Sequence, residues 1–134
     1  MYRFPAVVAA LLLTTGAYAE EKIIDTGLKG MTAKELNRNT STANDGMDVV
    51  QILVSLEPNY QSPKHMHPGD ETFFVRNGAI TVTMEGGHSQ SLKEGEAIFI
   101  KKGMVHQAKA GAEPTTLFIT GIYEKGKPFL QVVE

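Results

Sequence analysis

The chain contains no cysteine, so no disulfide can stabilise its fold even in an oxidising compartment. Stability must come from a hydrophobic core, and from any metal or partner subunit that the protein binds. With 134 residues the chain has room for one domain, which is large enough to bury such a core.

Basic clusters are also missing. The 13 basic and 15 acidic side chains give a formal net charge of −2, and the only adjacent basic pair is Lys101 and Lys102, which we expect in a solvated turn. A mildly acidic chain without a basic patch is a poor candidate for binding nucleic acid or an anionic membrane surface.

No apolar run is long enough for a membrane anchor, which needs about 20 residues. The uncharged stretch of residues 4–16 is shorter than that, follows Arg3, and precedes a small-x-small pattern at residues 17–19. This layout is typical of a secretory signal peptide. We therefore expect residues 1–19 to be cleaved and the mature chain to be periplasmic or secreted, without membrane attachment.

Residues 20–46 are polar and contain several glycines, so we expect an N-terminal lead-in before the folded domain of residues 47–134. Within the lead-in, residues 32–38 suit either a short helix or an edge strand, and the pattern does not decide between them. Residues 39–46 are dense in small polar residues and predict a loop.

From residue 48 onward the pattern is almost wholly that of β-strands. Residues 48–57 alternate, with apolar side chains at every second position. Asn77-Gly78 is a strong hairpin signal, and Gly86-Gly87 marks another turn. Eight or so short strands separated by such turns predict a sandwich or a small barrel. The further strands are expected at residues 72–77, 80–84, 88–92, 97–100, 105–110 and 115–123.

Three of the four histidines fall close to one carboxylate in this pattern. His65 and His67 are two residues apart, so they share one face of an extended strand. Glu71 opens the next strand of an expected hairpin, and His106 lies on a later strand. Imidazole and carboxylate together suit iron, manganese, nickel, copper or zinc. The sequence therefore predicts one divalent transition metal, and it predicts that His88, in a turn, is solvated.

The spacing of these residues resembles the first motif of the cupin superfamily: G, five residues, HxH, three or four residues, E, six residues, G. His65, His67, Glu71 and Gly78 match it. Asn59 stands in place of the first glycine, and asparagine also tolerates a left-handed turn.

The second cupin motif, G, five residues, PxG, two residues, H, three residues, N, is matched at Gly95, Gly103 and His106. Lys101 and Ala110 replace its proline and asparagine. The resemblance covers residues 47–123 and is strongest to small single-domain, quercetin-dioxygenase-like bacterial cupins.

This resemblance implies an all-β, single-domain, cupin-type double-stranded β-helix, which is a jelly-roll barrel. It implies a metal held by His65, His67, Glu71 and His106. It also implies a homodimer in which the N-terminal segment or residues 115–133 pack across subunits.

For activity, the resemblance implies a metal-dependent, dioxygenase-like oxidoreductase acting on a small metal-chelating substrate, with Glu71 either binding the metal or serving as a base. Two alternatives stay open: a non-catalytic module that binds a small ligand or metal, and a metal-dependent isomerase.

Strand parity predicts the side chains around the metal. Phe73 and Val75 share the parity of Glu71, and Ala108 and Ala110 share that of His106. We expect these four to line a small apolar pocket, with Tyr60 at its mouth. Val54 and Met84 are further candidates for the lining, and Phe74 is expected in the core.

Overall fold

In the computed structural model the described residues are 21–134, so the predicted signal peptide lies outside them. Strands are the only regular secondary structure in the described residues, and all of them pair antiparallel, which confirms the all-β prediction. No helix in this part of the protein has the length and hydropathy needed to cross a membrane.

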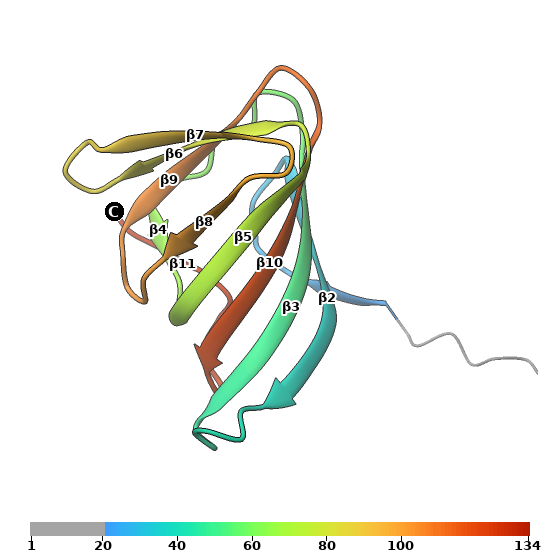
Figure 1. The fold of residues 1–134 in the computed structure, drawn as a ribbon, viewed down its shortest axis with the longest axis vertical. Coiled ribbons are helices and arrows are strands. Elements are labelled where there is room, and N and C mark those ends of the chain that lie inside the picture. The colour runs from blue at the N-terminus through green and yellow to red at the C-terminus, as the bar shows by residue number, and fades with distance from the viewer. Residues whose placement is uncertain (1–20) are drawn as a thin grey trace, which may run out of the picture.

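The strands form two sheets that face each other (Figure 1). The six-stranded sheet has the order β1-β2-β3-β10-β5-β8, and the five-stranded sheet has the order β11-β4-β9-β6-β7. The first sheet contains β1 (Lys22–Ile24), β2 (Met31–Thr40), β3 (Met47–Leu56), β10 (Thr115–Glu124), β5 (Gly69–Asn77) and β8 (Ala97–Ile100). The second contains β11 (Gln131–Val132), β4 (His65–Met66), β9 (His106–Ala110), β6 (Ala79–Met84) and β7 (Ser89–Lys93).

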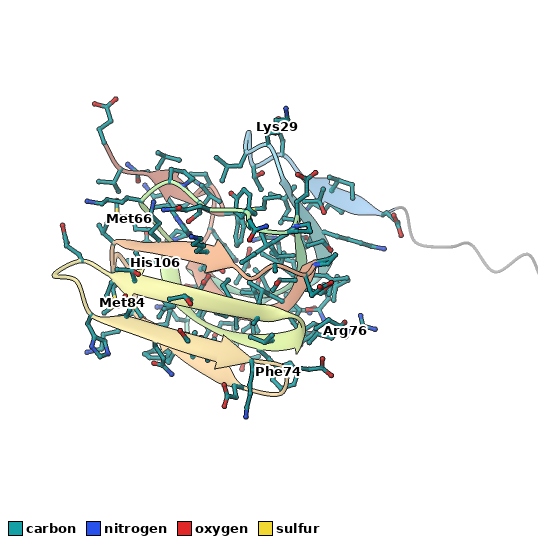
Figure 2. The ribbon with its side chains drawn as sticks, turned by 90° about the horizontal axis from the view of Figure 1, so that it is seen from above. Lys29, Met66, Phe74, Arg76, Met84 and His106 are labelled. Carbon is teal, nitrogen blue, oxygen red and sulfur yellow. The ribbon has the colours of Figure 1, made fainter. Side chains whose placement is uncertain are left out.

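The core lies between the sheets and follows the predicted alternation. On β3 the inward side chains are Val50, Ile52, Val54 and Leu56, and all four are buried. Each fully buried aliphatic side chain of this kind stabilises the fold by roughly 1.5–3 kcal/mol. Phe74 is an exception to the prediction: it is 43% exposed, because its strand neighbours Phe73 and Val75 take the inward face (Figure 2).

The lead-in contributes two strands to the larger sheet. Residues 32–38, left open between helix and strand, belong to β2, which lies between β1 and β3. Ala33 on β2 is buried in the core, and Lys22 on β1 forms a 2.8 Å ion pair with Glu35. The sheet therefore starts well before residue 47, where the sequence analysis places the start of the domain.

Two connections that the sequence assigns to hairpins instead cross between the sheets. Residues 67–68 lead from β4 to β5, and Asn77-Gly78 leads from β5 to β6; in both cases the two strands lie in different sheets. Gly78 has φ +81° and lies against Pro114, where a Cβ would come within 2.7 Å of the carbonyl oxygen. The hairpin prediction from Asn77-Gly78 is wrong because a positive φ and close backbone packing, where the chain passes from one sheet to the other, also require a glycine. Gly86-Gly87, in contrast, does join the paired strands β6 and β7.

Candidate metal centre

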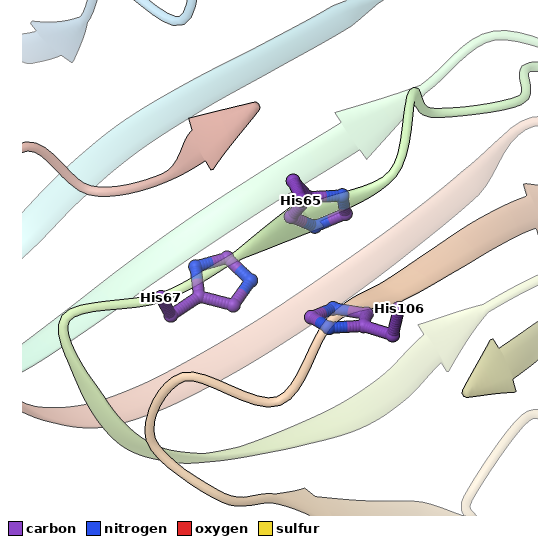
Figure 3. A group of neighbouring side chains, drawn as sticks. All are labelled: His65, His67 and His106. Atoms are coloured by element: carbon purple, nitrogen blue, oxygen red, sulfur yellow. The ribbon is translucent and has the colours of Figure 1, made fainter. Parts of the chain in front are cut away.

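Three histidines converge between the two sheets (Figure 3). His65 on β4 and His106 at the start of β9 are direct register partners, and His67 follows β4. One ring nitrogen from each histidine lies within 4.8 Å of the other two, and all three side chains are buried. The structure thus brings together the three predicted imidazole ligands. His88 is exposed and lies outside this group.

Each of the three rings is oriented by a backbone carbonyl. In each ring Nδ1 lies 2.9 Å from a carbonyl oxygen. The partner of His65 is Pro63, that of His67 is Phe129, and that of His106 is Met104. Because a carbonyl only accepts hydrogen bonds, each Nδ1 must carry the proton and donate. Each Nε2 is then left with its lone pair, which is the state in which imidazole binds metal.

Glu71 approaches the histidine group from the opposite sheet. It is fully buried on β5, and its Oε1 lies 3.2 Å from Nε2 of His67, while Oε2 accepts a hydrogen bond from the hydroxyl of Tyr123. Oε1 of an ionised Glu71 and Nε2 of His67 would be two acceptors facing each other. Only a proton or a cation between them makes this contact favourable. The three imidazoles therefore fit a divalent metal, and Glu71 contacts their group at His67.

Burial sets the protonation states around this site. It raises the pKa of Glu71 to about 7, although the Tyr123 hydrogen bond acts in the opposite direction. Burial also lowers the pKa of His65 to about 3 and that of His67 to about 4, and it lowers the pKa of His106. The histidines are consequently neutral at pH 7 and need release no proton before a metal binds.

Acidification is expected to destabilise the metal-free protein, and more steeply in a Glu71→Gln variant. Below pH 6.5 His65 and His67 bind protons in the unfolded chain but stay neutral in the folded protein, where they are buried. This difference lowers the free energy of unfolding by about 2 kcal/mol per histidine at pH 5. Glu71 acts in the opposite sense: its raised pKa contributes stability that is full below pH 4.5 and lost as the pH rises through 7. The test is to measure the melting temperatures of the wild-type protein and of Glu71→Gln between pH 7 and pH 5 in EDTA. If the melting temperature falls equally steeply with pH in the two proteins, the prediction is contradicted.

A cavity of about 40 Å³ lies against the histidines and Glu71. Of the predicted lining residues, Phe73, Ala108, Val54 and Tyr60 border it. Two others need correction, because Val75 and Ala110 are buried in the core but do not line this cavity. Each lies two residues further along its strand than Phe73 or Ala108, away from the end that carries the histidines.

Met84 is a further correction, since it lies outside this cavity as well. It borders a separate hollow beside the turn at Gly86-Gly87, which His106 also borders. Tyr60, expected at the pocket mouth, is half-buried, and its hydroxyl lies 3.7 Å from the sulfur of Met31.

Several site residues were missed because they come from segments far away in sequence. Met31 on β2 and Phe129 near the C-terminus both line the cavity. Phe129 also supplies the carbonyl that orients His67, and Tyr123 holds Glu71. The sequence analysis did not use one local signal that could have indicated an unusual position there, the glycine Gly121 inside an expected strand.

The sequence of the barrel strands matches one family model. A model of the cupin domain matches residues 52–121, more than half of the chain. The chain belongs to the cupin family. The match runs from β3 to β10 and includes His65, His67, Glu71 and His106. A search of curated proteins found no significant match.

Solved structures share this cupin's fold. A RmlC-like cupin from Shewanella frigidimarina NCIMB 400 aligns with TM-score 0.63 and 18% identity over 80% of this chain and 87% of its own. The polyketide cyclase RemF from Streptomyces resistomycificus aligns with TM-score 0.62 and 23% identity over 86% of this chain and 82% of its own. The DMSP lyase DddQ from Ruegeria pomeroyi DSS-3 aligns with TM-score 0.59 and 20% identity over 67% of this chain and 44% of its own. This chain therefore spans less than half of DddQ, and identities this low show the fold alone.

Proposed function

We propose that this cupin is a metal-dependent enzyme that acts on a small metal-chelating substrate, with a dioxygenase-like oxidation as its reaction. The observation that supports the proposal is the trio of buried imidazoles, each with Nδ1 bonded to a carbonyl and Nε2 left unprotonated. The reaction class rests on the resemblance of the sequence to quercetin-dioxygenase-like cupins, and it is therefore an analogy at the level of family.

His65, His67, His106 and Glu71 would hold the metal. When bound, a divalent transition metal supplies Lewis-acid activation of a chelated oxygen, and iron can also take part in oxidation. The chain's own groups would have two roles. The three neutral imidazoles would hold the metal in a fixed position, and Glu71 would hold or accept a proton at Oε1. Apolar walls around them exclude bulk water, which strengthens electrostatic interactions inside.

The cavity limits the substrate. Its volume of about 40 Å³ is far below the roughly 300–1,000 Å³ of pockets that enclose drug-sized ligands. This is little more than the roughly 30 Å³ that one water molecule occupies in the liquid, so beside a metal only the chelating atoms of a small substrate would fit. A larger substrate, such as a whole flavonol, would require Tyr60, Met31 or Phe129 to move.

A second candidate is proton transfer without oxidation, as in an isomerase or a lyase. The observation in its favour is Glu71, a buried carboxyl beside His67 with a pKa raised to about 7, because a group with a pKa near the working pH is suited to general acid–base catalysis. Among the structural neighbours, DddQ is named a lyase and RemF a cyclase. The third option is a non-catalytic module that binds a small ligand or metal.

One experiment separates these functions. The protein is purified from its own compartment, its metal is identified, and the metal-loaded form is offered catechols, flavonols, diketones and thiols. Oxygen uptake with product formation supports the dioxygenase. Product formation or deuterium exchange into the substrate without oxygen uptake, abolished by Glu71→Gln, supports proton transfer. Tight binding without turnover supports the module, and absence of metal from the wild-type protein overturns the whole proposal.

Export and dimer formation also stay predictions. For the homodimer, the outer face of the six-stranded sheet carries the exposed apolar side chains Phe74, Phe99 and Ile122. Ile122 belongs to the region, residues 115–133, that the resemblance places across subunits. A second copy packed on this face would remove these side chains from water.

A further inference from the structure

Tyr123 gives the two oxygens of Glu71 different neighbours. It lies on β10, is 2% exposed, and donates its hydroxyl hydrogen bond to Oε2 of Glu71 on the adjacent strand β5. The other oxygen, Oε1, lies 3.2 Å from Nε2 of His67. One oxygen of the carboxylate is thus engaged by the sheet behind it, and the other faces the histidine group.

Strand register explains how the hydroxyl reaches this position. The residue paired with Glu71 across the strands is Gly121, and Tyr123 is two positions further along β10 on the same face. A Cβ at position 121 would lie 2.5–2.6 Å from the two Cε atoms of the Tyr123 ring and closer still to Cζ. The ring therefore lies back over Gly121, in space that any larger residue would fill.

Other aromatic rings hold Tyr123 in place. Its ring centroid is 6.4 Å from that of His67, with the planes 20° apart, and 6.2 Å from that of Phe129, edge to face. The carbonyl of Phe129 in turn accepts the Nδ1 hydrogen bond of His67. Because these groups pack in fixed orientations, the hydroxyl has a defined position relative to both Glu71 and His67.

We propose that Tyr123 is a positioning residue, with Gly121 providing its space, and that it restricts Glu71 to acting on metal or substrate through Oε1 alone. The inference rests on the proposed metal site. Without the hydroxyl, Oε2 is left buried with no donor, which is unfavourable for an ionised carboxylate. The carboxylate is then also free to rotate away from His67. Loss of such a partner behind a metal ligand typically weakens metal affinity 10–100-fold.

A double-mutant cycle tests this positioning role. Dissociation constants for Co²⁺ are measured by chelator competition in the wild-type protein, Tyr123→Phe, Glu71→Ala and the double variant. Tyr123→Phe keeps the ring that packs on His67 and removes only the hydroxyl. We expect it to weaken binding at least 10-fold when Glu71 is present and to have no effect when residue 71 is alanine.

The outcomes are distinct. An unchanged or tighter affinity in Tyr123→Phe overturns the inference, and so does the same loss in both backgrounds, which would show a merely structural effect. A wild-type protein that binds no Co²⁺ overturns the proposed metal site instead.

Gly121→Ala is an independent variant, because it keeps the hydroxyl but displaces the ring, and it should weaken Co²⁺ binding like Tyr123→Phe. Its matched control is Thr120→Ala, on the other face of β10. That variant should bind Co²⁺ like the wild-type protein, and equal loss in both variants would overturn the inference.

Discussion

Replacing His65 and His106 together by alanine is expected to abolish metal binding, from about one metal per chain to none. The two rings face each other across β4 and β9, with centroids 4.3 Å apart, so their removal takes away two of the three neighbouring imidazoles. His67 and Glu71 alone offer too few donors for tight binding. Metal content after purification is the direct measurement, and melting temperature with and without added metal gives a second one.

The matched control is His88→Ala, because His88 is exposed in the turn between β6 and β7 and is not among the residues that line the cavity. That variant should keep its full metal content. Circular dichroism must show that the double variant remains folded. If the folded double variant carries as much metal as the wild-type protein, the site is assigned to the wrong residues.

Gly69→Ala is expected to destabilise the fold by about 3 kcal/mol or more, which lowers the melting temperature by roughly 10 °C. Gly69 is the first residue of β5 and pairs with Tyr123 on β10. A Cβ there would overlap the carbonyl oxygen of Ile122 and lie 2.9 Å from Cα of Tyr123. Both obstacles are backbone, so relief requires the two strands to separate where Glu71 and Tyr123 meet.

Gly111→Ala serves as the comparison. There a Cβ would meet the side chain and carbonyl of Ala79 at 3.6 Å, which is ordinary van der Waals contact. The melting temperature of Gly111→Ala should stay within a few degrees of the wild-type value. Thermal unfolding of both variants in EDTA measures the effect without a contribution from metal, and similar melting temperatures would contradict the close strand packing at Gly69.

Local patterns were sufficient for much of the fold and for the histidines. Alternation along residues 48–57 determines which face of β3 is buried, because side chains in a strand point to opposite sides in turn. The spacing of His65 and His67 places both on one face for the same reason. Asn59, matched to a glycine of the cupin motif, does adopt a left-handed conformation, with φ 58°.

Local sequence patterns could not predict which distant strands pair with each other. The Asn77-Gly78 signal indicates a tight turn equally well whether the next strand returns to the same sheet or enters the other one. Val75 and Ala110 have the correct parity for the pocket, yet how far a cavity extends along a strand depends on what fills the space opposite.

The sequence by itself therefore determined a β-rich chain in which three imidazoles and one carboxylate have the spacing of metal ligands, since spacing within a strand is set by local backbone geometry. Only the tertiary structure decided that Glu71 approaches from the other sheet, that Phe129 orients His67, and that Tyr123 lies over Gly121 to reach Glu71. These contacts join residues up to 62 positions apart. They depend on strand order and register, which arise from the packing of the whole core.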